Sequence, residues 1–269
     1  MMKKKKTFSG IYLAVLTIIT YVPILLTVIY SFNESKSSVN WTGFSLKWYE
    51  ELLRDREIKE ALINSLILAT SSCFLAVVLG TTGAIGIWKM SEKPEQYRGF
   101  QKINNIMSYI AMLPIMIPEI ILGMVFLAVF SFMDLPFGML TLIIAHTTFC
   151  VPYIFSMVKA RLVGMDKSLE EAALDMGASP FQVFRDITLP LIMPAILSGT
   201  MLAFAMSFDD VVISIFVTGA KVNTLPVKIY TKLKTGVTPE INALATVMLL
   251  VTLILLVASR IISKKWKRQ

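Results

Sequence analysis

The sequence predicts an all-α integral membrane protein with six membrane-spanning helices and both chain ends in the cytoplasm. Three observations support this fold class. The 269 residues are 55% hydrophobic with a mean hydropathy of +0.69. Apolar runs recur at about the 20-residue length with which a helix spans a bilayer. Of the 26 Lys and Arg residues, 17 fall in segments that this topology places inside, and such an excess marks the cytoplasmic side.

The six spans are expected at residues 8–32, 62–88, 104–132, 138–160, 191–217 and 242–263. The first follows a tetra-lysine run that looks like the start of a signal peptide, but its apolar stretch is too long and no cleavage pattern ends it. We therefore expect a retained span. The predicted domains are an N-terminal tail with this span, an extracytoplasmic loop, a five-helix transmembrane domain and a basic cytoplasmic tail, at residues 1–33, 34–60, 61–259 and 260–269.

The third span is longer than one bilayer crossing requires and carries Pro114 and Pro118. Proline removes a backbone donor and kinks a helix. In a membrane, a kink is tolerated where the freed backbone is buried in protein or lines a cavity. We expect this span to be bent or broken, with Glu119 at the start of the second half.

The cytoplasmic loop of residues 161–190 predicts two short helices. Asp166 to Ser168 can cap the first, and Gly177 can end it as a C′ glycine. Ser179 and Pro180 start the second helix, and we expect Pro190 to stop it. The result is a helix-turn-helix on the inner membrane surface.

The same loop, residues 166–190 in particular, carries a spaced set of small, acidic and apolar residues, namely Glu171, Ala172, Ala173, Gly177, Ile187, Leu189 and Pro190. This pattern resembles the EAA loop of ABC importer permeases with the type I importer fold. In that family the loop is a coupling helix that docks into a groove of a cytoplasmic ATPase. A chance amphipathic helix is the alternative, and a DNA-binding motif is weaker still because the loop carries charges of both signs.

The segments SFNESKSSVNWTGFSLKWYEELL, SFDDVVISIFVTG and LPVKIYTKLKTGVTPEINALAT extend the resemblance to the spermidine/putrescine importer permeases. The resemblance implies a second homologous permease subunit in a heterodimer, two ATP-binding cassette subunits and an extracytoplasmic polyamine-binding protein. No GxxxxGK[ST] phosphate loop occurs in the chain. We therefore expect no cofactor here and no enzymatic activity, with ATP and Mg bound by the partner ATPase.

Three acids lie within predicted spans: Glu119, Asp209 and Asp210. A central Asp costs about 2.5–3.5 kcal/mol on insertion scales, and such residues usually face a cavity or a partner. No Lys or Arg lies deep in a span to pair with them. On one continuous helix, Asp210 would share a face with Ser207 and Ser214, which makes it the stronger candidate of the adjacent pair.

For a polyamine cation, carboxylates supply counter-charge, and aromatic rings such as Phe208 supply cation–π contacts. We predict a substrate path lined by Asp209, Asp210, Glu119, Ser207, Ser214 and Phe208. The alternative is that the acids cap a broken helix or bond to the partner permease. The single histidine, His146, is interpreted as a hydrogen-bonded packing residue rather than a gate.

Two other functions stay open. An ABC permease for another small solute, such as ferric iron or thiamine, would carry the same EAA loop. An ion-coupled secondary carrier would use the acids as ion sites but predicts an inverted repeat and leaves the loop unexplained. Cys73 and Cys150 lie in apolar runs without metal spacing. We expect no metal site and no nucleic-acid partner, because basic residues gather only at membrane flanks.

Overall fold

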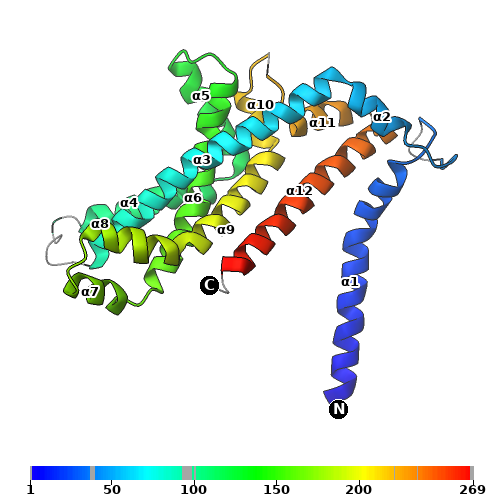
Figure 1. Cartoon of the computed structure of the whole chain (residues 1–269). Coiled ribbons are helices and arrows are strands. Elements are labelled where there is room, and N and C mark those ends of the chain that lie inside the picture. The colour runs from blue at the N-terminus through cyan, green and yellow to red at the C-terminus, as the bar shows by residue number, and fades with distance from the viewer. Residues whose placement is uncertain are drawn as a thin grey trace. The chain divides into compact units, whose positions relative to one another are not determined.

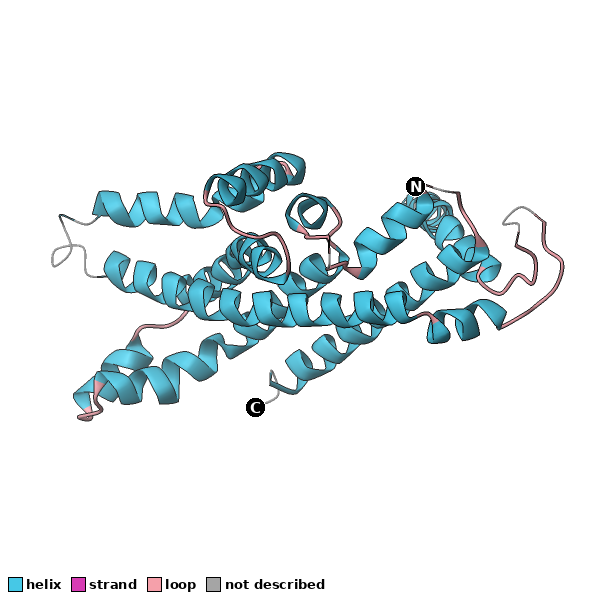
Figure 2. Ribbon diagram, turned by 90° about the horizontal axis from the view of Figure 1, so that it is seen from above, coloured by secondary structure: helices cyan, strands magenta, loops and turns pink. Residues whose placement is uncertain are grey.

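The computed structural model describes residues 2–36, 40–92, 99, 101–220, 222–234 and 236–266. Lys221 and the last three residues of the predicted basic tail lie outside this range. The described part is helical, with one isolated bridge between Asn33 and Phe44 (Figure 2). Its elements are α1 (Met2–Tyr30), α2 (Lys47–Arg54), α3 (Arg56–Glu92), α4 (Gln101–Met116), α5 (Glu119–Phe132), α6 (Met139–Val163), α7 (Ser168–Asp175), α8 (Pro180–Val183), the π-helix η2 (Phe184–Thr188), α9 (Leu189–Asp209), α10 (Val212–Val217), α11 (Leu225–Leu233) and α12 (Pro239–Trp266) (Figure 1).

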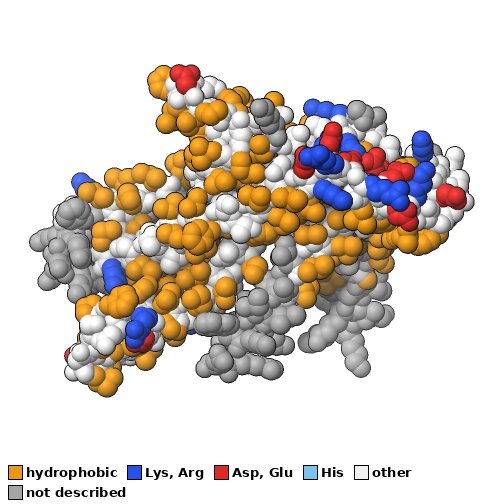
Figure 3. Space-filling model, turned by 45° about the horizontal axis from the view of Figure 1, so that its top comes forward, with side chains coloured by type: hydrophobic (Ala, Val, Ile, Leu, Met, Phe, Trp, Pro, Cys, Tyr) orange, Lys and Arg blue, Asp and Glu red, His pale blue; other side chains and the backbone are white. Residues whose placement is uncertain are grey.

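Among the described residues, four helices are long and apolar enough to cross a membrane: Tyr12–Tyr30, Arg56–Ser91, Met139–Val163 and Pro180–Asp209. A fifth candidate is the pair Lys102–Met116 and Glu119–Phe132, and Pro239–Ile254 is a shorter apolar helix. Hydrophobic side chains dominate the face shown in Figure 3, and charged ones gather in a few clusters. The chain is thus a multi-pass membrane protein.

The expected break in the third span is present. Helices α4 and α5 meet at a bend of 107°, with Pro114 inside α4 and Pro118 at the N-cap of α5. The Pro118 carbonyl accepts from the Leu122 amide at 3.0 Å, which opens the new helix. Glu119 is the first residue of α5, as predicted, and its side chain is exposed.

The chain divides into two compact units, one of residues 1–60 and 228–253 and one of residues 61–227 and 254–269. In the larger unit, α6 packs against both α3 and α9, with glycine at the contacts. A Cβ on Gly80 of α3 would lie 3.1 Å from the Val151 carbonyl oxygen, and a Cβ on Gly199 of α9 would lie 3.0 Å from the Ile154 Cα. Only glycine lets these backbones approach so closely, as small residues do in membrane helix packing.

Helix α10 is fixed at the other end of this unit, away from α7 (Figure 1). The ring of Phe216 fills the space where Gly123 of α5 lacks a side chain, 2.5 Å from an added Cβ. Thr141, at the start of α6, donates its hydroxyl to the Val217 carbonyl at 2.9 Å. These contacts hold a helix of only 6 residues in place.

Helix α11 carries Lys228 and Lys232, whose partners lie in the same chain. Lys228 bonds to Glu57, and Lys232 bonds to Glu240 and lies 3.9 Å from Asp55. These lysines are therefore neutralised by acids of their own chain.

Candidate functional site

The first helix of the EAA loop, α7, is capped at both ends as the sequence predicts. The Asp166 carboxylate accepts from the Ser168 amide at 3.0 Å. Hydrogen bonds from Ser168 hold the pKa of Asp166 below its usual range. Gly177 has φ +86°, and its amide donates to the Leu174 carbonyl at 2.9 Å. A left-handed residue at C′ is the usual glycine ending of a helix.

The second helix does not stop at Pro190, and this prediction was wrong. The Ser179 hydroxyl accepts from the Gln182 amide at 3.3 Å and starts α8. The chain then passes through η2 directly into α9, where Pro190 occupies the first turn. Proline is tolerated there because the π-helix η2 directly precedes it, and local π adjustments in membrane helices accommodate the amide that proline lacks. The loop and the following span therefore form one continuous rod from Pro180 to Asp209.

One side-chain bond ties α7 to the start of this rod. The Thr188 hydroxyl donates to the Glu170 carboxylate, and Thr188 itself is 2% exposed. Ala173 of α7 is also buried. At the same end Arg161 of α6 donates to the Leu191 carbonyl of α9 at 2.9 Å. Movement of α7 is thus linked to both α6 and α9.

The EAA loop exposes large apolar side chains among charged ones. Glu171 and Ala172 lie on this surface, and Ile187 and Leu189 are half-buried behind it. The large apolar side chains with the greatest exposure here are Leu169 (48%), Leu174 (47%), Met176 (84%) and Phe181 (68%). Large apolar side chains exposed together on a loop are typical of an interaction surface.

The fifth span is broken beside its paired acids, so the expectation of one continuous helical face was wrong. Helix α9 ends at Asp209, Asp210 has extended backbone angles (φ −69°, ψ 127°), and α10 starts at Val212. The Asp210 carboxylate accepts from the amides of Ile213 at 3.2 Å and Ser214 at 2.9 Å. Asp210 therefore caps α10, which is the alternative that the sequence left open.

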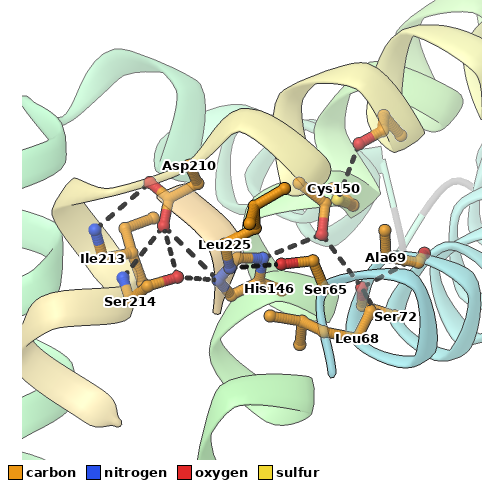
Figure 4. Close-up of polar contacts among 12 residues, drawn as sticks. Ser65, Leu68, Ala69, Ser72, His146, Cys150, Asp210, Ile213, Ser214 and Leu225 are labelled. Atoms are coloured by element: carbon orange, nitrogen blue, oxygen red, sulfur yellow. Dashed lines mark hydrogen bonds and ion pairs between the residues drawn. The ribbon is translucent and has the colours of Figure 1, made fainter. Parts of the chain in front are cut away.

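Ser214 lies directly against Asp210 and donates its hydroxyl to that carboxylate at 2.9 Å, with His146 beside both (Figure 4). Ser207 is linked to this group through His146 rather than through a shared helix face. His146 of α6 has no exposed surface; its Nδ1 lies 2.8 Å from the Ser207 hydroxyl, and its Nε2 lies 3.0 Å from the Ser214 hydroxyl. The Nε2 atom also lies 3.4 Å from an Asp210 oxygen. His146 is thus a hydrogen-bonded packing residue, as interpreted, and it lies beside the Asp210 carboxylate.

The predicted path residues fall into two groups. Asp210, Ser207, Ser214 and Phe208 are buried within the chain, with Phe208 1% exposed and stacked on Phe204. Asp209 and Glu119 are exposed. Among the residues that the structure describes, no group of three or more His, Cys, Asp or Glu side chains is arranged to hold a metal ion.

Comparison with known proteins assigns the family. Residues 96–268 match the model of the binding-protein-dependent transport system inner membrane component. The chain is 40% identical over 245 residues to the spermidine/putrescine transport system permease protein PotC of Haemophilus influenzae, covering 91% of this chain and 92% of that one. The chain belongs to this family of transport permeases.

A second relative of the permease is the putrescine transport system permease protein PotI of Escherichia coli, with 42% identity over 235 residues, 85% of this chain and 81% of that one. A solved bacterial alginate ABC transporter, in complex with a periplasmic protein bound to alginate pentasaccharide, shares the fold with a TM-score of 0.74 at 16% identity, covering 98% and 96% of the two chains. The MetNI methionine transporter gives 0.66 at 20% identity, covering 79% and 99%. The permease therefore has the ABC importer fold.

Removing the Thr188 hydroxyl by Thr188→Val should loosen α7, because a hydrogen bond to a charged group contributes about 1.5–3 kcal/mol. We expect amide hydrogen exchange in residues 168–176 of the assembled complex to rise about 10-fold or more. Thr200→Val is the matched control, since that hydroxyl donates only to Ile196 within α9. Equal exchange in wild type and Thr188→Val would mean that the bond does not hold the loop.

Proposed function

We propose that the chain is the permease subunit of an ATP-driven importer of polyamines of the spermidine and putrescine class. The observation that carries the proposal is the 37–42% identity, over 85% or more of the chain, to permeases named for spermidine/putrescine and putrescine transport. The capped loop and the acids on the fifth span support it. The subunit would cross the membrane six times with both ends inside, α12 supplying the last span.

In the assembly that we propose, this subunit pairs with a second homologous permease in a heterodimer. Two ATP-binding cassette subunits bind ATP and Mg, so this chain needs no cofactor. An extracytoplasmic polyamine-binding protein delivers the cargo, a role supported by the alginate transporter solved with its periplasmic protein. Membrane lipid covers the rest of the apolar surface.

The exposed apolar surface of the EAA loop fits a groove on the ATPase. Closure of the ATPase pair would move α7, and Thr188 with Arg161 would pass that movement to α9 and α6. Because helices rise 1.5 Å per residue, α9 extends about 30 Å from Leu189 to Asp209. The EAA loop and the acidic end of the span are thus opposite ends of one rod.

The cargo path, in this proposal, is lined by Asp209 and Glu119. Both carboxylates are exposed in the single chain, so a neighbouring permease or a cation can approach them. Exposed carboxylates in a low-dielectric cleft concentrate cations and raise their entry rate. Asp210, with Ser207, Ser214 and Phe208, supports this end of the span from inside the chain.

Deletion of the gene should abolish ATP-dependent uptake of labelled spermidine and putrescine, and the wild-type gene should restore it. Uptake should also be lost when the phosphate-loop lysine of the partner ATPase is replaced. Unchanged polyamine uptake in the deletion strain would reject this cargo and favour another small solute, such as ferric iron or thiamine. Uptake that does not depend on the ATPase lysine would favour an ion-coupled carrier.

Gly177→Pro and Glu171→Lys should leave the subunit inserted but uncouple it from the ATPase. Proline cannot adopt the positive φ at position 177, and lysine reverses a charge on the docking surface. We expect co-purification of the ATPase and substrate-stimulated ATP hydrolysis to fall together. Gly177→Asn, which tolerates positive φ, and Glu51→Lys, on exposed α2, are the controls. Normal coupling in both test variants would refute the docking assignment.

Asp209→Asn should lower polyamine uptake about 10-fold, since it removes an attractive charge from the path, while the complex still assembles. Asp209→Glu keeps the charge and should retain most of the activity. Asp210→Asn should instead lower the yield of assembled complex, because Asp210 is buried within the chain. Wild-type uptake kinetics in Asp209→Asn would remove Asp209 from the path.

A further inference from the structure

The segment after the first span reverses its direction at the end of α1. Helix α1 ends at Tyr30. The Glu34 amide donates to the Gly43 carbonyl at 3.0 Å, and the Ser45 amide donates to the Phe32 carbonyl at 2.7 Å. These bonds hold the outgoing and the returning chain side by side. We call the described residues of this segment, 31–36 and 40–46, the aromatic loop.

Asn33 holds the aromatic loop together from inside. It has no exposed surface. Its side-chain nitrogen donates to the Asn40 carbonyl at 2.8 Å, and its side-chain oxygen accepts from the Thr42 amide at 3.0 Å. Its backbone carbonyl accepts from the Trp48 indole at 2.7 Å, which ties the loop to α2. Because these polar groups bond to each other, they can lie where water is scarce, a place that unpaired polar groups do not tolerate.

Aromatic rings of the loop contact each other and the end of α1. Phe32 and Phe44 stack with their centroids 5.1 Å apart, and Trp41 meets Tyr30 edge-on at 6.3 Å. In each of these pairs one ring is half-buried and the other is exposed, with Phe44 69% exposed and Trp41 47% exposed. Exposed rings gathered in this way are typical of a contact surface.

The apolar surface of α1 leads directly to these rings. No residue of the span Tyr12–Tyr30 is buried within the chain, and Leu26 and Ile29 near its end are 46% and 50% exposed. Tyr30, the last residue of the span, is the ring that Trp41 contacts. The lipid-facing surface of the span therefore continues onto the loop.

The other side of the aromatic loop leads to a charged surface. Apart from Leu53, the exposed side chains of α2 are charged, namely those of Lys47, Glu50, Glu51 and Arg54. The loop thus joins an apolar helix to a charged one (Figure 1). Amphipathic aromatic side chains are enriched at the boundary between hydrocarbon and water, which is the boundary that such a junction requires.

We propose that the aromatic loop is a membrane anchor, with Trp41 and Phe44 at the boundary between the headgroups and acyl chains of the outer leaflet, where they fix the depth of α1. The contact of 2.6 Å between the Ser31 and Tyr49 hydroxyls connects the anchor to α2 as well. The choice of the outer leaflet rests on the topology proposed above. The anchor does not depend on which solute is carried.

Electron paramagnetic resonance of nitroxide labels tests the anchor in the importer complex, reconstituted in vesicles of phosphatidylethanolamine and phosphatidylglycerol. One label is attached through Phe44→Cys, and a control label through Glu50→Cys on the exposed side of α2. Cys73 and Cys150 are buried, and the unsubstituted complex gives the background. Oxygen concentrates among acyl chains, whereas a nickel chelate stays in water. We therefore expect the ratio of oxygen to nickel accessibility to be several-fold higher at position 44 than at position 50.

Equal ratios at the two positions would overturn the anchor, because position 44 would then lie in water. A label at position 44 that is shielded from both reagents would also overturn it and would indicate a protein partner there. Either result can occur together with normal polyamine uptake, so a failure of the anchor is distinct from a failure of the proposed cargo.

Removal of the rings tests their effect on α1. A label attached through Ile29→Cys reports the depth of the end of this helix. With Trp41→Ser and Phe44→Ser together, we expect nickel accessibility at position 29 of the assembled complex to rise several-fold, because the helix end is no longer held at the boundary. Trp41→Phe with Phe44→Tyr keeps both rings and is the matched control. Unchanged accessibility at position 29 in the serine variant would overturn the role of the rings in fixing α1.

Discussion

The carboxylate of Asp210 supports the break in the fifth span, and the geometry of that end of the molecule follows from it. A bilayer offers no water to unpaired backbone amides, so a helix can stop inside it only where protein groups replace the missing bonds. Asp210 binds the first amides of α10, and His146 lies beside Asp210. The break then turns α10 against α5, where Phe216 fills the space beside Gly123. Two neighbouring aspartates consequently have different environments, one inside the chain and one on its surface.

Much of this fold could be predicted from local signals. The proline pair in the third span identified the bend, and the Asp166 capping signal with the later Gly177 identified α7 and the turn after it. The break at Asp210 was less accessible, because no proline or glycine marks it and the apolar run continues on both sides. The only sequence feature at this break is the energetic cost of placing an aspartate in hydrocarbon. That cost indicates a special environment for Asp210 but does not give the structure of that environment.

The environments of the acids depended on contacts between segments distant in the sequence. His146 precedes Ser207 by 61 residues, and no spacing rule relates them.

The prediction that Pro190 stops a helix failed for a local reason. Proline disrupts a regular helix interior, but here the π-helix η2 directly before it accommodates the missing amide. Sequence alone did not reveal this π-helix, which joins α8 to α9.

The glycine contacts of α6 determine how this subunit can move. At Gly80 of α3 and at Gly199 of α9, the neighbouring backbones approach α6 with no side chain of their own in the way. Such close approach leaves the three helices little freedom to slide or rotate against each other, because packed interiors have few voids. A force applied at one end would therefore tilt the three helices together as one rigid body. Bending would then occur at the breaks in the third and fifth spans.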